Sequence, residues 1–120
     1  MNNTRSVTDW WQAGLFCFYG GNMKKVNVLG TEYTIEEKKL EECDGYCDHS
    51  TKEIKITEKT GDIGDFPRYQ RKVMRHELIH AFLFESGLHQ EFGHDEVTID
   101  WMAAQFPKMV KCFREAGCLE

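Results

Sequence analysis

The sequence predicts an α+β domain in which a small antiparallel or mixed β-sheet precedes two helices. Short segments rich in β-branched residues lie within residues 25–57, whereas helical patterns dominate the rest of the chain. With 120 residues, the chain has room for one hydrophobic core. The run His-Glu-Leu-Ile-His, residues 76–80, lies within the first helical pattern. We therefore expect a sheet of three or four strands packed on the helix that carries this run.

Four segments have strand character: residues 25–29, 31–35, 45–48 and 53–57. The last two are separated by a polar tetrapeptide, which predicts a hairpin between them. In the final segment Ile54 and Ile56 alternate with Lys55 and Thr57, a pattern typical of a strand with one buried face.

The first helix is predicted between Pro67 and Gly87, since the intervening residues include neither proline nor glycine. Its apolar residues crowd into the C-terminal half, which indicates a helix buried on most of its circumference. Asp65 is expected to cap its N-terminus. Gly87 is expected to end it in the left-handed conformation.

A second helix is predicted over residues 95–106, with apolar residues spaced three or four apart. Pro107 is expected to kink or restart this helix, because proline lacks an N–H group and clashes with the preceding turn. Residues 108–116 would then form a last helical piece that ends at Gly117.

The spacing of His76 and His80 indicates a metal site. Residues at i and i+4 of a helix lie one turn apart on the same face, so two imidazoles there can bind one tetrahedral Zn²⁺ ion. Glu77 would lie beside the metal without binding it, placed to take a proton from water as a general base. The competing interpretation is a surface helix with solvated histidines. The helix signals on both sides favour the zinc site.

A third protein ligand is expected downstream of the two histidines. The candidates are His89, Glu91, His94, Asp95, Glu96 and Asp100. We favour Glu96, because Glu96 and Asp100 lie at i and i+4 of the second helix and point the same way. Glu96 could then bind the metal while Asp100 accepts the ring N–H of a ligand histidine. His94, just before this helix, is the alternative third ligand.

The H-E-x-x-H run, followed by Glu96-Val-Thr-Ile-Asp100, resembles the pattern of gluzincin metallopeptidases. Within that class the chain is similar to the small ImmA/IrrE-like metallopeptidases, particularly the short versions carried by phages and mobile elements. The likeness covers most of residues 24–117. Three stretches carry it: residues 44–48, 75–87 and 99–107.

This resemblance implies a minimal zincin-like fold and a zinc-dependent endopeptidase that cleaves a protein substrate, such as a repressor or regulator of a mobile element. It implies zinc ligands at His76, His80 and Glu96, with Glu77 as the general base. The chain departs from the family in its very short linker between His80 and Glu96.

Two other interpretations remain open. The motif helix followed by Gly93-His94 is also similar to the SprT-like proteases, whose third ligand is a histidine. The Gly-x-x-Phe continuation of those proteins is missing after His94, so this resemblance ranks second. The other possibility is a non-catalytic module that keeps the metal for stability and recognises a partner protein. The intact Glu77 favours an enzyme.

The composition narrows the functional classes further. A net charge of −5 without a basic stripe argues against non-specific nucleic-acid binding. No apolar run approaches the roughly 20 residues that a membrane span requires. Five cysteines, an odd number, and no secretory signal predict free thiols in a cytoplasmic protein. Residues 1–22 are expected to be an N-terminal extension outside the core, with the metallopeptidase domain over residues 23–120.

Overall fold

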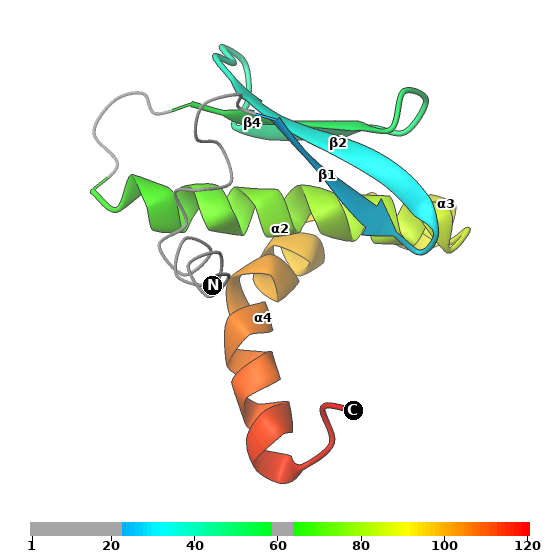
Figure 1. Ribbon diagram of the computed structural model, residues 1–120, viewed down its shortest axis with the longest axis vertical. Helices are drawn as coiled ribbons and strands as arrows, with labels where there is room; N and C mark the ends of the chain where they lie inside the picture. Colours follow the sequence, from blue (N-terminus) through cyan, green and yellow to red (C-terminus); the bar gives the residue numbers. More distant parts are fainter. Residues whose placement is uncertain (1–22, 59–63) are drawn as a thin grey trace, which may run out of the picture.

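The computed structural model describes residues 23–58 and 64–120 of the chain, so the predicted N-terminal extension lies outside the described residues. A four-stranded sheet packs on one side of a long helix, α2, and a second long helix, α4, lies on its other side (Figure 1). The prediction of an α+β fold with the sheet before the helices is confirmed. The described elements are β1 (Met23–Val28), β2 (Thr31–Lys38), β3 (Gly45–Asp48), β4 (Glu53–Thr57), α2 (Phe66–Glu85), α3 (His89–Phe92) and α4 (Glu96–Ala116).

The sheet is mixed, with the strand order β1-β2-β4-β3. Strands β1 and β2 form an antiparallel hairpin, as do β3 and β4, which confirms the hairpin expected for the second pair. The two hairpins join through parallel pairing of β2 with β4, in which Ile35 is opposite Ile54. Strand β3 is therefore an edge strand of the sheet. It borders the candidate metal centre described below.

The core lies between the two central strands and α2. Tyr33 and Ile35 of β2 are fully buried, as are Ile54 and Ile56 of β4. They pack in one cluster with residues of α2. The alternation predicted for β4 thus holds for its isoleucines. Thr57, expected to face outward, is also buried, because α2 covers the end of the strand and Gln70 Nε2 donates to the Thr57 carbonyl at 3.0 Å.

The ends of α2 follow the sequence signals. The Asp65 side chain accepts a hydrogen bond from the Arg68 backbone N–H at 3.2 Å, and Gly87 adopts a φ of 74° just after the helix. The short helix α3 lies where the sequence predicts no element. It brings the chain back toward α2 before α4 begins. Its first residue, His89, thereby comes close to α2.

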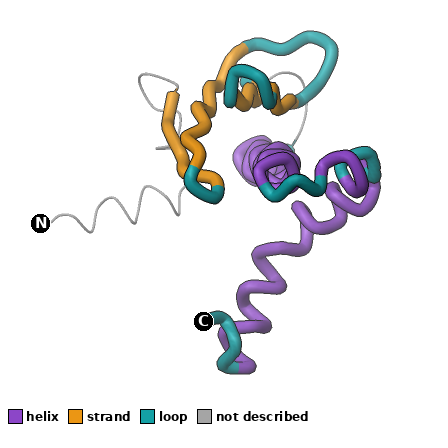
Figure 2. Tube along the Cα trace, turned by 90° about the vertical axis from the view of Figure 1, so that its right-hand side faces the viewer, coloured by secondary structure: helices purple, strands orange, loops and turns teal. Residues whose placement is uncertain are grey.

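Helix α4 runs through Pro107 as one element, so the expectation of a separate last helix after this proline is wrong. The missing N–H of a proline frees the carbonyl four residues earlier, which is that of Ala103. Arg75 of α2 donates its Nε–H to this carbonyl at 2.6 Å. A side chain from another helix thus replaces the lost backbone hydrogen bond. The C-terminal part of α4 extends away from the sheet and α2 (Figure 2).

A partly buried polar cluster links the C-terminal end of α2 to the sheet. Glu85 accepts hydrogen bonds from Tyr33 Oη at 2.7 Å and Thr31 Oγ1 at 3.0 Å, and it pairs with Lys52 Nζ at 2.8 Å. The hydrogen bond from Lys52, followed by that from Tyr33, lowers the pKa of Glu85 from 4.5 to about 2. The ionised carboxylate is therefore favoured in the folded state.

This cluster predicts acid sensitivity. Because the folded-state pKa of Glu85 is depressed, its contribution to stability is present above the unfolded pKa and is lost as the pH falls from about 4.5 toward 2. Glu85→Gln should reduce the dependence of the melting temperature on pH in this range. Glu115→Gln, at an exposed position on α4, is the matched control and should leave it unchanged. Identical pH profiles for wild type and Glu85→Gln would refute the assignment.

Candidate metal centre

Three side chains from two helices converge on one point. His76 Nε2 lies 2.8 Å from Glu96 Oε1, and His80 Nε2 lies 3.2 Å from the same oxygen. The ligand atoms of the three residues all lie within 4.8 Å of one another, so they could hold a metal ion. Helix α2 supplies both histidines from adjacent turns, and the first turn of α4 supplies the carboxylate. The favoured candidate for the third position, Glu96, is thus the one that joins the histidines.

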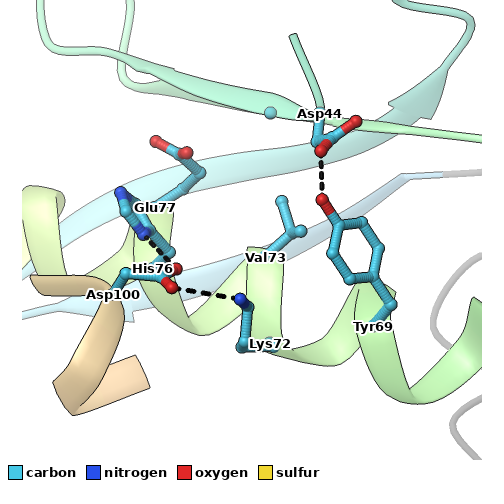
Figure 3. A pocket seen from close by; sticks show the side chains of 8 residues that line it. Asp44, Tyr69, Lys72, Val73, His76, Glu77 and Asp100 are labelled. Carbon is cyan, nitrogen blue, oxygen red and sulfur yellow. Dashed lines mark hydrogen bonds and ion pairs between the residues drawn. The ribbon is translucent and has the colours of Figure 1, made fainter. Parts of the chain in front are cut away.

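A second layer of contacts orients His76. Its other ring nitrogen, Nδ1, lies 3.1 Å from Asp100 Oδ1, one turn beyond Glu96 on α4. Lys72 Nζ donates to the second oxygen of Asp100 at 3.1 Å (Figure 3). A carboxylate that accepts the Nδ1–H of a histidine leaves the Nε2 lone pair for a metal. The expected contact between Asp100 and one of the two motif histidines is therefore present, with Lys72 as an additional partner that the sequence pattern does not suggest.

Glu77 is buried beside these residues without joining them, with 8% of its surface exposed. Strand β3 covers it at Gly45, where a Cβ atom would lie 2.8 Å from Val73 Cγ1 and 3.4 Å from Glu77 Cγ. Only glycine allows the strand to approach α2 this closely. Burial, with a smaller contribution from Glu96, raises the pKa of Glu77 from 4.5 to about 7. The carboxyl group can consequently gain or lose a proton near neutral pH.

A narrow pocket of about 190 Å³ leads from Glu77 along α2. Figure 3 shows His76, Glu77 and Asp100 at one end of this pocket and Tyr69 with Asp44 at the other. Tyr69 donates its hydroxyl hydrogen to the Asp44 carboxylate. Burial and this hydrogen bond raise the pKa of Tyr69 to about 12. The phenol therefore stays protonated at neutral pH.

A larger pocket of about 430 Å³ adjoins the first one and shares His76 and Glu77 with it. All five histidines of the chain line it: His49, His76, His80, His89 and His94. Edge strand β3 forms one wall through Gly45, Tyr46 and Cys47. The pocket thus joins the candidate metal ligands to the edge of the sheet.

The other candidate ligands lie outside the three-residue group. His94 is exposed at the side of the pocket, with its ring centroid 5.8 Å from that of His89. Asp95 caps α4 by accepting a hydrogen bond from the Thr98 N–H at 3.0 Å. Glu91 is exposed on α3. His49 and His89 stand in polar segments typical of solvated histidines, yet both line the pocket. Their approach depends on how the hairpin turn and α3 fold back, which no local pattern encodes.

Comparisons with known proteins add no assignment: no protein-family model, curated protein or solved structure matches this chain. Within residues 23–58 and 64–120, none of the helices combines the length and apolarity needed to cross a bilayer. The four cysteines in these ranges are free thiols. The function is therefore inferred from the geometry of the histidine-lined site.

Proposed function

We propose that this chain is a zinc-dependent endopeptidase of the gluzincin type, with a minimal zincin-like fold. One observation carries the proposal: a buried glutamate whose pKa is about 7 lies directly beside two histidines and a carboxylate able to hold a metal. A purely structural metal site has no use for such a group, whereas hydrolysis requires it.

The donor set suits zinc. Two imidazole nitrogens and one carboxylate oxygen are the ligands of the His₂Glu class of catalytic zinc sites, which leaves a position open. When bound there, zinc polarises a carbonyl group and makes water more acidic. Asp100 would hold His76 in the tautomer that presents Nε2 to the metal, as carboxylates do around other zinc histidines.

Glu77 would serve as the general acid and base. Its carboxylate accepts a proton from the attacking water and then gives that proton to the departing amine of the peptide. A pKa near neutrality suits both halves of this exchange, because neither protonation state is strongly favoured. Burial beneath β3 raises the pKa of Glu77, so this strand would contribute to catalysis by setting the protonation behaviour of the general base.

The substrate would be an extended peptide segment. Edge strand β3 lines the histidine pocket, and a strand edge can hold an extended chain by backbone pairing. The resemblance to ImmA/IrrE-like metallopeptidases points to a protein substrate, such as a repressor or other regulator of a phage or mobile element. The proposal thus specifies cleavage of an exposed, extendable segment of a protein.

Glu77→Gln tests catalysis separately from metal binding. The substitution should lower the rate of peptide hydrolysis by about 10²- to 10⁴-fold, because it removes the group that moves the proton. Zinc content should stay unchanged, since Glu77 lies outside the ligand group. Digestion of an unfolded protein such as casein, together with metal analysis, gives both readings.

Glu91→Gln, an exposed carboxylate on α3, is the control and should behave as wild type. Full activity in Glu77→Gln would refute the proposed chemistry. If the protein's effect in cells persists after Glu77→Gln, the alternative of a non-catalytic module that recognises a partner protein would be favoured instead. Comparing the cellular proteins cleaved by wild type with those cleaved by Glu77→Gln would then identify the substrate.

A further inference from the structure

Two histidines that line the larger pocket, outside the group of His76, His80 and Glu96, contact each other. His49, in the turn between β3 and β4, and His89, at the start of α3, bring their Nε2 atoms to 3.4 Å although they lie 40 residues apart. This separation is longer than the usual N–H hydrogen bond of about 2.7–3.2 Å. Two nitrogens bound to one tetrahedral zinc at about 2.0–2.1 Å lie roughly 3.3–3.4 Å apart. The pair is therefore spaced like two ligands of one metal ion.

Neighbouring groups fix the ring of His49. Cys47 Sγ lies 3.6 Å from its Nδ1, which leaves Nε2 directed at His89. The ring of Phe84 stacks on it, with centroids 4.3 Å apart and planes at 4°. Asp48 shapes the turn that carries it by accepting hydrogen bonds from Ser50 N at 3.0 Å and Ser50 Oγ at 2.7 Å.

The ring of His89 is held with comparable precision. It lies against Gly93, where a Cβ atom would be 2.4 Å from His89 Cδ2 and 2.5 Å from His89 Nε2. The backbone at Gly93 has a φ of −69°, which every residue type adopts, so its conformation does not demand glycine. The absence of a side chain instead leaves space for the imidazole.

We propose that His49 and His89 form a second site, for a divalent transition-metal ion such as Zn²⁺ or Co²⁺. It shares no ligand with the group of His76, His80 and Glu96, and it adjoins that group, since the ring centroids of His80 and His89 are 5.6 Å apart. Two imidazoles leave the remaining coordination positions to water or to donors of a bound peptide. The second site consequently binds metal more weakly than the three-ligand site.

Titration of the metal-free full chain with Co²⁺ tests the site, because calorimetry counts the ions bound and visible absorption reports their ligands. Wild type should bind two equivalents, one tightly and one more weakly. His49→Gln and His89→Gln should each retain the tight equivalent and lose the weak one. His94→Gln removes another histidine of the same pocket and should still bind two. These readings are independent of any peptidase activity.

Gly93→Ala tests the ring position without removing a ligand. The new methyl group must displace the His89 imidazole, so we expect the weak equivalent to lose affinity by about 10-fold or more, as when groups that orient metal ligands are changed. If Gly93→Ala binds the weaker equivalent of Co²⁺ as tightly as wild type, the observed position of the His89 ring does not contribute to metal binding. A single equivalent in wild type, or two in both His49→Gln and His89→Gln, would overturn the proposal.

Discussion

Replacing Glu96 by alanine should weaken the tighter equivalent of Zn²⁺ by more than about 100-fold, beyond the 10- to 100-fold typical for groups that only support a ligand. Glu96 Oε1 is the oxygen that lies closest to both histidines, at 2.8 Å from His76 Nε2 and 3.2 Å from His80 Nε2. His94→Ala should change this affinity by only a few-fold, because the exposed ring lies outside that group.

Asp100→Ala should fall between these two variants, with a loss of about 10- to 100-fold. Asp100 contacts His76 Nδ1 and therefore acts by orienting the ring. Competition with a zinc-sensitive chelator dye would measure all three affinities under one condition. A larger loss in His94→Ala than in Glu96→Ala would contradict our ligand assignment and support the SprT-like interpretation.

The candidate site is predictable from the sequence because its geometry is set within helices. His76 and His80 lie one turn apart, as do Glu96 and Asp100, so helical periodicity alone places each pair on a common helix face. The helix ends are equally local, since Asp65 and Gly87 act on residues close to them in sequence. Such features depend on only a few neighbouring residues.

The features that the sequence does not reveal all depend on distant parts of the chain. The parallel pairing of β2 with β4 joins two hairpins, and no signal within either strand selects that partner. Likewise, His49 meets His89 only because the hairpin turn and α3 approach the same face of α2. The raised pKa of Glu77 depends on burial beside β3, which follows from the tertiary packing at Gly45.

Helix α4 shows how a tertiary contact can override a local signal. A proline inside a helix costs about 3 kcal/mol or more when the freed carbonyl and the crowded turn go uncompensated. Here the carbonyl of Ala103 belongs to a fully buried residue, and Arg75 donates to it. Burial lowers the pKa of Arg75, yet a guanidinium remains charged at neutral pH, so it continues to donate. We therefore expect the continuity of α4 through Pro107 to depend on Arg75 of α2.

A double-mutant cycle tests this dependence. Arg75→Met keeps the aliphatic stem but removes the donor, and it should lower the free energy of unfolding by about 1–3 kcal/mol, because a buried carbonyl loses its partner. In a Pro107→Ala background, the restored backbone N–H can bond the Ala103 carbonyl, so the same substitution should cost much less. Urea denaturation of the metal-free proteins would give the four free energies.

The expected coupling between Arg75 and Pro107 is about 1–2 kcal/mol, within the range of residues that share one hydrogen-bond network. Arg68→Met, at an exposed position on α2, is the matched control and should change stability by no more than about 0.5 kcal/mol in either background. Equal costs of Arg75→Met with proline and with alanine at residue 107 would show that the carbonyl does not need the guanidinium. A clear coupling would show that Arg75, one residue before His76 on α2, stabilises the fold by satisfying the carbonyl that Pro107 leaves free in α4.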